Sequence, residues 1–248
     1  MNMRTLLALC ALLPLAVTAQ SLPPLLQADG ALNPAWRFVG FPKKHADLPA
    51  SRFEAGAVDG QAALKVTTAS SYGTLVHDTP DAAPATLQWR WRLDQALAGG
   101  TTAPNLLSKA GDDAALKVCV MFDHPLERVP FVERTVLRIA RSVSGEALPA
   151  ATVCYVWDSA APAGLQGANP YTRRVRFISL RGSEAPSAQW LSEQRNLSAD
   201  FTTLFADELP PGAPVPRVRT VLIGADSDNT ASRSLGWVTS LRLTPLSP

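Results

Sequence analysis

The stretch from Thr86 to Asp94 alternates apolar and polar side chains, and this alternation constrains the fold more than any other feature of the chain. Successive side chains of a β-strand point to opposite faces, so a period of two indicates a strand with one buried and one open face. Such strands are typical of antiparallel sheets that cover a core. The expected buried face holds Leu87, Trp89, Trp91 and Leu93, and the open face holds Gln88, Arg90, Arg92 and Asp94.

Similar extended patterns recur along most of the chain, separated by Pro, Gly, Asp and Asn, the residues that favour turns. Two stretches differ. The spacing predicts an amphipathic helix over 131–142, between Pro130 and Gly145, and a short helix from Ser198, as N-cap, to Phe205. The expected strands are 62–68, 73–77, 86–94, 114–123, 152–157, 172–181, 189–197, 218–225 and 235–243.

Many short strands with few helices favour a mainly β fold. The simplest arrangement is a two-sheet antiparallel β-sandwich, jelly-roll-like, with one inserted amphipathic helix and a short second helix. A barrel is the alternative. A sandwich leaves the outer face of at least one sheet open as a binding surface. In the last strand, one buried face is expected to hold Leu235, Trp237, Thr239, Leu241 and Leu243.

The first nineteen residues have the layout of a secretory signal peptide. Arg4 precedes an apolar run from Leu6 to Val17, and small residues lead to a predicted cleavage after Ala19. The run is shorter than the roughly 20 residues of a transmembrane helix, so no retained membrane span is expected, although a retained anchor is the alternative. The mature protein would be periplasmic or secreted. It would consist of a Pro-rich lead-in over 20–34, running over the surface, and a single β-sandwich domain over 35–245.

Cleavage after Ala19 would leave two cysteines, Cys119 and Cys154, each in an expected strand. An even pair in an oxidising compartment predicts a disulfide, with two buried free thiols as the alternative. A bridge between them would close a loop of about 35 residues and stabilise the folded state by roughly 3–4 kcal/mol in the chain-entropy model.

Composition excludes several classes of function. The formal net charge is only +2, whereas a general nucleic-acid-binding protein shows a basic excess. There is no G-x-S-x-G motif and no phosphate-binding glycine loop. The histidines, His45, His77 and His124, show no metal-ligand spacing and are expected at the surface.

Two acidic segments are the first candidates for ligand contacts. Asp226, Asp228 and Thr230 end an expected strand, and their oxygens could contact a ligand or bind Ca²⁺ through Asp226 and Asp228. A tight turn closed by side chain to backbone hydrogen bonds is the alternative. Asp112 and Asp113 are adjacent on an extended chain and point in opposite directions.

Either Asp112 or Asp113 could meet Asp226 or Asp228 at a sheet end, since the paired carboxylates of glycoside hydrolases flank their substrate in this way. A turn with one salt-bridged aspartate is the alternative for Asp112 and Asp113. No residue is assigned a catalytic role from the sequence.

Cations form a second candidate surface. Arg90 and Arg92 would lie opposite the tryptophans, and Lys117, Arg174 and Arg176 would share their surface if the strands were neighbours. Such a patch suits acidic polysaccharide, phosphate or lipid headgroups, while a solvated and locally neutralised face is the alternative.

Aromatic residues divide into two groups. Trp89, Trp91 and Trp237 lie on apolar faces and are expected in the core, whereas Tyr72 lies in a loop-like stretch and is the better ligand contact.

The order of several motifs resembles the bacterial secreted family catalogued as domain of unknown function 3047. The motifs are the segments Leu87–Leu93, Lys109–Val118, Cys154–Trp157, Asn196–Phe201 and Ile223–Thr230, with Trp190 and Glu193. The resemblance covers roughly 36–243, and Gly-Asp-Asp-Ala-Ala and Asp-x-Asp-Asn-Thr are its most specific parts. It implies an exported single-domain β protein, somewhat similar to carbohydrate-binding jelly rolls, with no established activity. Where the family has Arg after the Gly-Asp-Asp motif, this chain has Lys117.

The first functional hypothesis is a non-enzymatic protein that binds carbohydrate or other cell-envelope material. The second is a glycan-acting hydrolase that uses loop carboxylates. The third is a structural or interaction module with no small ligand. No cofactor is expected except Ca²⁺ as an alternative, and the expected partner is a glycan or envelope component.

Overall fold

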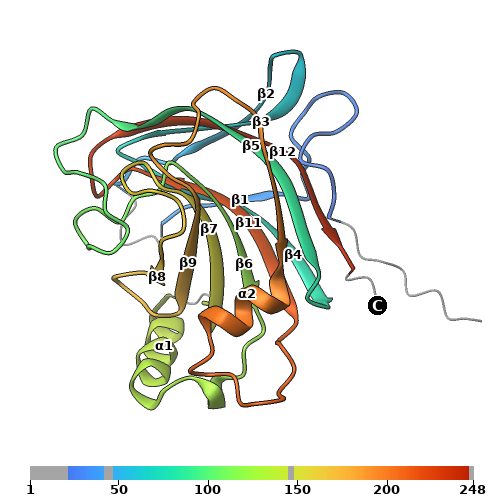
Figure 1. The fold of residues 1–248 in the computed structure, drawn as a ribbon, viewed down its shortest axis with the longest axis vertical. Coiled ribbons are helices and arrows are strands. Elements are labelled where there is room, and N and C mark those ends of the chain that lie inside the picture. The colour runs from blue at the N-terminus through green and yellow to red at the C-terminus, as the bar shows by residue number, and fades with distance from the viewer. Residues whose placement is uncertain (1–21, 42–46, 145–147, 246–248) are drawn as a thin grey trace, which may run out of the picture.

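Two β-sheets pack face to face in the computed structural model, which describes residues 22–41, 47–144 and 148–245 (Figure 1). The prediction of a mainly β, two-sheet sandwich with two helices is confirmed. The predicted signal peptide, 1–19, lies outside the described residues. No helix in the described ranges is long and apolar enough to span a bilayer.

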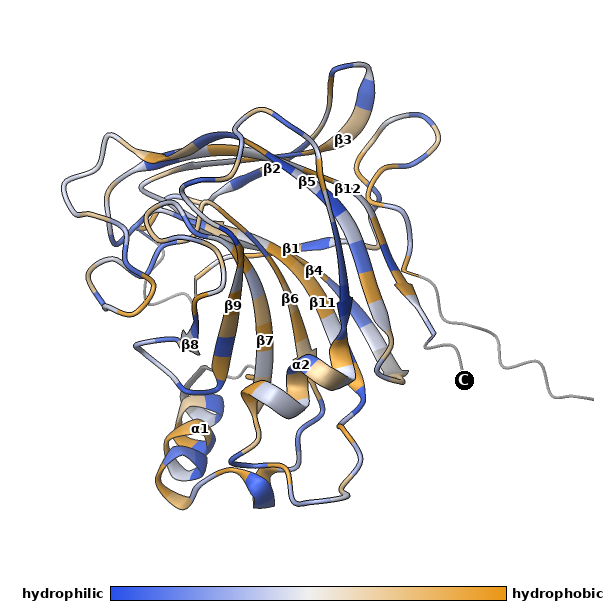
Figure 2. Ribbon diagram, viewed as in Figure 1, coloured by the Kyte–Doolittle hydropathy of each residue, from blue (hydrophilic) through white to orange (hydrophobic). Residues whose placement is uncertain are grey.

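The larger sheet has seven strands, and all its neighbours are antiparallel except β7 and β9, which run parallel. Its spatial order is β1 (Arg37–Val39), β4 (Tyr72–Ala82), β11 (Val218–Asp226), β6 (Leu116–Phe122), β7 (Ala151–Trp157), β9 (Val175–Arg181) and β8 (Gln166–Ala168). Most of these strands are hydrophobic along much of their length (Figure 2).

The smaller sheet has five antiparallel strands. Its spatial order is β10 (Leu191–Asn196), β5 (Thr86–Ala98), β12 (Arg233–Thr244), β3 (Gln61–Ala69) and β2 (Arg52–Val58). The sequence did not predict β1, β2 or β8, because none of them carries a run of alternating large apolar residues.

The inward faces of β5 and β7 form the centre of the core. Trp89 and Trp91 are buried, and their ring centroids lie 5.3 Å from Tyr155 and 5.4 Å from Trp157, respectively. The predicted buried face of β5 is therefore confirmed. Aromatic pairs at such separations contribute about 0.5–1.5 kcal/mol beyond the burial of their area.

The predicted buried face of the last strand is wrong in its N-terminal half. Ser240 has φ 56°, and the register of β12 against β5 shifts between Thr239 and Arg242. This bulge inserts one residue and changes the phase of the strand. Val238, rather than Trp237, therefore lies in the core with Leu241 and Leu243. Trp237 is buried as well, but on the outer face of the sheet, where its Nε1 donates to Asp94.

The lead-in segment contributes to the core as well as crossing the surface. Leu22 and Leu25 are buried in the same apolar cluster as the central tryptophans. Trp36 is buried too, and its Nε1 donates to the carbonyl of Pro23 over 3.2 Å.

Cys119 and Cys154 form a disulfide, as predicted. They are directly opposite each other on β6 and β7. Both belong to a second apolar cluster on the outer face of the seven-stranded sheet. Leu106, from the loop between β5 and β6, joins this cluster, so that loop covers part of the outer face.

Both predicted helices are present. A short helix, η2 (Leu126–Arg128), and α1 (Phe131–Ser144) connect β6 to β7, and α1 stands at a corner of the molecule (Figure 1). The second helix is α2 (Leu197–Leu204). The predicted cap at Ser198 is wrong: Asn196 is the N-cap, and its side chain accepts from the amides of Ser198 and Ala199.

Candidate functional site

The two acidic segments come together beside Lys117, at the start of β6. We name this group the acidic-loop cluster. Its members are Tyr72, Asp112, Asp113, Lys117, Asn169, Tyr171, Asp226, Asp228, Asn229 and Thr230. Hydrogen bonds join Asp112 to Asn169 and Asp113 to Thr230, so three separate loops meet in one place.

A buried ion pair between Lys117 and Asp226 forms the base of the cluster. Nζ of Lys117 lies 2.5 Å from Oδ2 of Asp226, and Oδ1 accepts from the amide of Ala114 over 2.7 Å. Burial raises the pKa of Asp226, although Lys117 opposes this shift. Burial alone would lower the pKa of Lys117, but the attraction of Asp226, together with Tyr72 and Asp112, more than offsets burial and raises this pKa above its usual value.

Asp113 holds the turn after β11 in place. Its Oδ2 accepts from the amide of Thr230 over 2.7 Å and from the Thr230 hydroxyl over 2.5 Å. That hydroxyl also lies 2.6 Å from Oγ of Ser232. Asp113 and Thr230 are both buried, so their polar atoms shape the loop and do not face solvent.

Gly111 allows the loop before β6 to close on itself. A Cβ at this position would lie 2.6 Å from the amide nitrogen of Asn105 and 2.7 Å from the carbonyl oxygen of Ala103. The carbonyl of Gly111 accepts from the Asn105 amide over 2.8 Å. This tight packing fixes the position of the neighbouring Asp112.

Asp112 and Asp228 are the carboxyl groups of the cluster that are only partly buried. Burial raises the pKa of Asp112 to about 7, and nearby Asp226 adds to the shift, while Lys117 opposes it. Burial, reinforced by Asp226 and Asp113, raises the pKa of Asp228 to about 6. Each group can therefore hold or release a proton near neutral pH.

Tyr171 presents an aromatic ring to solvent at the edge of the cluster. The residue is 57% exposed, yet its hydroxyl oxygen lies 2.8 Å from the carbonyl oxygen of Lys109 and 3.1 Å from Oδ1 of Asn229. Its amide donates to Oδ1 of Asn169 over 2.9 Å. The Lys109 ammonium lies 5.4 Å from the ring centroid. The ring is therefore exposed and held at both ends.

Tyr72 lies next to the Lys117–Asp226 pair. It is half-buried, its ring centroid is 4.1 Å from that of Phe41, and Nζ of Lys117 lies 5.9 Å from the ring. Burial raises the pKa of Tyr72. Tyr72 therefore borders the cluster and exposes less of its ring than Tyr171 does.

The geometry of Asp226 does not suit the Ca²⁺ alternative. Both of its carboxylate oxygens already accept hydrogen bonds, and the Lys117 ammonium occupies the position next to Oδ2. In the part of the chain that the structure describes, no group of three or more His, Cys, Asp or Glu side chains could hold a metal ion.

Arg90 and Arg92 lie apart from the cluster, on β5 of the five-stranded sheet. Lys117 on β6 and Arg176 on β9 belong to the seven-stranded sheet, and Arg174 directly precedes β9. The strands are therefore not neighbours of β5, and the condition for one shared basic surface is not met. The strand order, which decides this question, could not be deduced from the sequence.

Both arginines of β5 have local partners. Arg92 is buried and forms ion pairs with Asp59 and Asp94. Arg90 donates to Gln61 over 2.9 Å and stacks on Trp190, with its guanidinium 5.3 Å from the ring centroid. A shallow hollow of about 260 Å³ lies next to Arg90, lined by residues of β5, β10 and β12.

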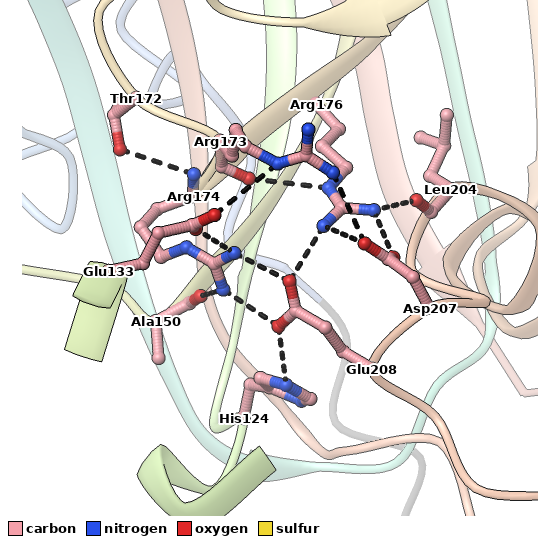
Figure 3. A network of polar contacts seen from close by, with 10 residues as sticks. All are labelled: His124, Glu133, Ala150, Thr172, Arg173, Arg174, Arg176, Leu204, Asp207 and Glu208. Atoms are coloured by element: carbon pink, nitrogen blue, oxygen red, sulfur yellow. Dashed lines mark hydrogen bonds and ion pairs between the residues drawn. The ribbon is translucent and has the colours of Figure 1, made fainter. Parts of the chain in front are cut away.

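Arg174 and Arg176 belong to a buried network beyond the end of β6 that lies away from Lys117 (Figure 3). Glu208 accepts from Arg174 over 2.5 and 2.7 Å and from Arg176 over 2.6 Å, and Arg174 also pairs with Glu133. Nε2 of His124 lies 3.1 Å from Glu208. His124 is buried, so its predicted surface position is wrong.

Sequence reasoning missed Tyr171, Asn169 and Lys109. The run Asn169-Pro170-Tyr171-Thr172 is a turn signal with an aromatic residue inside it, and turns run over the surface of a protein. That local pattern could have identified Tyr171. The contact of Asn169 with Asp112 is tertiary and has no local signal.

Comparison with solved structures gives distant likenesses. One is described as "X-ray crystal structure of a non-crystalline cellulose specific carbohydrate-binding module: CBM28", with 11% identity and a TM-score of 0.40, covering 90% of this chain and 93% of that chain. Another is an agarase, AgWH50C, with 9% identity and a TM-score of 0.34, covering 92% of this chain and 26% of that chain. Likenesses this weak support no inference about function.

No match is found among curated proteins. A family model does match, over residues 34–242, which is most of the chain and includes the whole acidic-loop cluster. The chain therefore belongs to the family described as Protein of unknown function (DUF3047).

Proposed function

We propose that this protein binds carbohydrate at the acidic-loop cluster. The observation that carries the proposal is Tyr171, an exposed aromatic ring that Lys109 and Asn229 hold in one orientation. A ring that is fixed before the ligand arrives loses little conformational entropy on binding.

The polar groups around Tyr171 fit the hydroxyl groups of a sugar. An aromatic ring offers an apolar face that can pack against the C–H face of a pyranose, and amides and carboxyls can donate to and accept from hydroxyls. Asn169, Asn229 and Asp112 supply such groups within the same cluster. A pKa of about 7 lets Asp112 donate a hydrogen bond when protonated and accept when ionised.

We propose that the protein works outside the cytoplasm, as a single β-sandwich domain over 35–245 released after cleavage at Ala19. The Cys119–Cys154 disulfide supports this, since disulfides persist in oxidising compartments. In that setting, glycans of the cell envelope or its surroundings are within reach.

A glycan array followed by calorimetry with the best ligand tests the proposal. Tyr171→Ala is expected to weaken binding at least about tenfold, because the stacking surface is lost. Tyr171→Phe should weaken binding less than Tyr171→Ala, because it keeps the ring and removes only the hydroxyl contacts that hold it. Phe131→Ala removes a similarly exposed ring from α1, outside the cluster, and is the matched control.

Two results would contradict carbohydrate binding at this cluster. A folded protein that binds no glycan on the array would favour a module that interacts with other macromolecules. Equal losses from Tyr171→Ala and Phe131→Ala would place the glycan elsewhere.

Glycan hydrolysis is the second candidate function, and the raised pKa of Asp112 favours it. A general acid works best when its pKa lies near the working pH, and about 7 meets that condition. The test measures the release of reducing ends from a glycan. If Asp112→Asn abolishes this release and retains the affinity for the glycan, the protein is a hydrolase. Binding without release, at all pH values tested, would leave the protein a binder only.

A further inference from the structure

We propose that helix α1 docks on the surface of a lipid bilayer with anionic headgroups, through an exposed apolar stripe and the arginines on another face of the same helix. This interaction surface is separate from the acidic-loop cluster and does not depend on the proposed carbohydrate binding. No described helix is long and apolar enough to cross a bilayer, so the contact would lie at the interface.

The stripe consists of large apolar side chains that the fold leaves open. Val132, Val136 and Ile139 are 71%, 61% and 59% exposed, and their spacing of four and three residues places them on one face of the helix. Phe131, 73% exposed, lies at the start of the same helix. These four account for half of the exposed large hydrophobic residues found in the described ranges.

The rest of the helix fixes this orientation. Leu137 is buried against Val129 and Ala150, and Glu133 pairs with Arg174 of the buried network. Figure 3 shows Glu133 reaching from α1 into that network. The helix stands at a corner of the molecule (Figure 1) and is anchored through other residues, while the side chains of the stripe are exposed.

Charge favours an anionic surface as the occupant. The acidic residue of α1, Glu133, is paired with Arg173 and Arg174. Arg138 is exposed and has no ion-pair partner among the described residues, and the guanidinium of Arg134 lies 5.8 Å from the Phe131 ring. An exposed apolar stripe combined with basic residues on the polar face is typical of helices that lie in the headgroup region. Each such cation strengthens the attraction to an anionic membrane.

A second copy of the chain fits this surface less well. A stable pair buries roughly 800 Å² on each partner, with about 20–30 residues a side, whereas the stripe offers four large side chains.

Co-sedimentation with vesicles tests the proposal on the chain starting at Gln20, which contains the whole described β-sandwich. Vesicles of phosphatidylcholine mixed with phosphatidylglycerol are compared with pure phosphatidylcholine, at low and high salt. We expect binding to the mixed vesicles that weakens with salt. The double variant Val136→Asp/Ile139→Asp should partition at least about tenfold less, since charge replaces two apolar anchors. Arg138→Glu should also weaken binding.

The control variant is Leu48→Asp, which places a charge at an exposed apolar residue far along the chain from α1 and should bind as the parent does. Circular dichroism and the melting temperature verify that each variant is folded.

Absence of the parent protein from sedimented anionic vesicles would overturn the proposal, as would equal binding of the double variant. A parent that is dimeric in solution, with the double variant monomeric, would assign the stripe to a second copy. Glycan affinity is measured on the same variants and should not change.

Discussion

At the scale of single residues, partial burial decides the chemistry of the acidic-loop cluster. Asp113 and Asp226 have their oxygens engaged by Thr230 and Lys117, whereas Asp112 has fewer partners and a raised pKa of about 7. The ordinary pKa of an aspartate in an unfolded chain is about 3.9. Protonation of Asp112 therefore stabilises the folded state below that value, and this contribution is lost as the pH rises to about 7.

Replacing Asp112 with Asn should remove this pH dependence. At pH 8 we expect the variant to be about 1 kcal/mol more stable than the parent, a rise in melting temperature of about 2–4 °C. At pH 4 the two proteins should unfold at nearly the same temperature, because Asp112 of the folded state is then protonated and neutral, as Asn is. Thermal unfolding followed from pH 4 to 8 measures this. A variant that is less stable at every pH would show that the carboxylate itself stabilises the loop.

At the scale of elements, periodicity predicted where helices and strands occur better than how they begin or which side they bury. The sequence indicated α1, α2 and most strands of both sheets. It misplaced the cap of α2, since Asn196 ends β10, paired with Thr86, and caps the helix at the same time. It also missed the bulge at Ser240, because no Gly, Pro, Asp or Asn lies next to it in the sequence.

The cap of α2 can be tested by paired substitutions. Asn196→Ala should lower the free energy of unfolding by about 1 kcal/mol, because the first amides of the helix lose their acceptor. Ser198→Ala, at the position that the sequence pattern favoured, should change it by only a few tenths. Urea unfolding of both variants measures the difference. Equal effects at the two positions would contradict the assignment of Asn196 as the cap.

At the scale of the whole molecule, the buried network of Figure 3 connects segments that are distant in the sequence. Arg176 belongs to β9 and Arg174 to the turn before it. Glu133 belongs to α1, and Glu208 to the segment after α2. The side chain of Glu208 is fully buried. Burial opposes its ionisation, but hydrogen bonds from Arg174 and His124 lower its pKa to about 2.

Glu208→Gln should destabilise the protein by about 3 kcal/mol at pH 7, because it leaves buried guanidinium groups without their counter-charge. A lowered pKa stabilises the folded state above pH 4.5, and the contribution is lost as the pH falls toward about 2. The loss caused by the variant should therefore shrink at pH 3. Asp207, a more exposed carboxylate, pairs with Arg176 of the same network. Asp207→Asn should lower the free energy of unfolding by less than about 1 kcal/mol. Urea unfolding at both pH values measures these effects, and equal losses from the two variants would contradict the dominant role of Glu208.

The candidate site was only partly accessible to sequence reasoning. Asp112 and Asp226 stand out as acidic turn residues, and their segments meet at a sheet end, where Asp226 accepts from Lys117 and Ala114 and Asp113 accepts from Thr230. The strand order that separates Arg90 from Lys117 depends on how distant strands pair, and local patterns carry no information about that. The contact of Tyr171 with Asn229 was hidden for the same reason.

The turn between β8 and β9 has a consequence for both proposed ligands. Asn169 and Tyr171 belong to the acidic-loop cluster, while Arg173 and Arg174, two and three residues after Tyr171, contact Glu133 of α1. The hydrogen bonds and ion pairs of this hairpin hold it before either ligand arrives. A sugar at Tyr171 and a bilayer at α1 would therefore meet the protein at a fixed separation, and neither would have to order the segment that joins their surfaces.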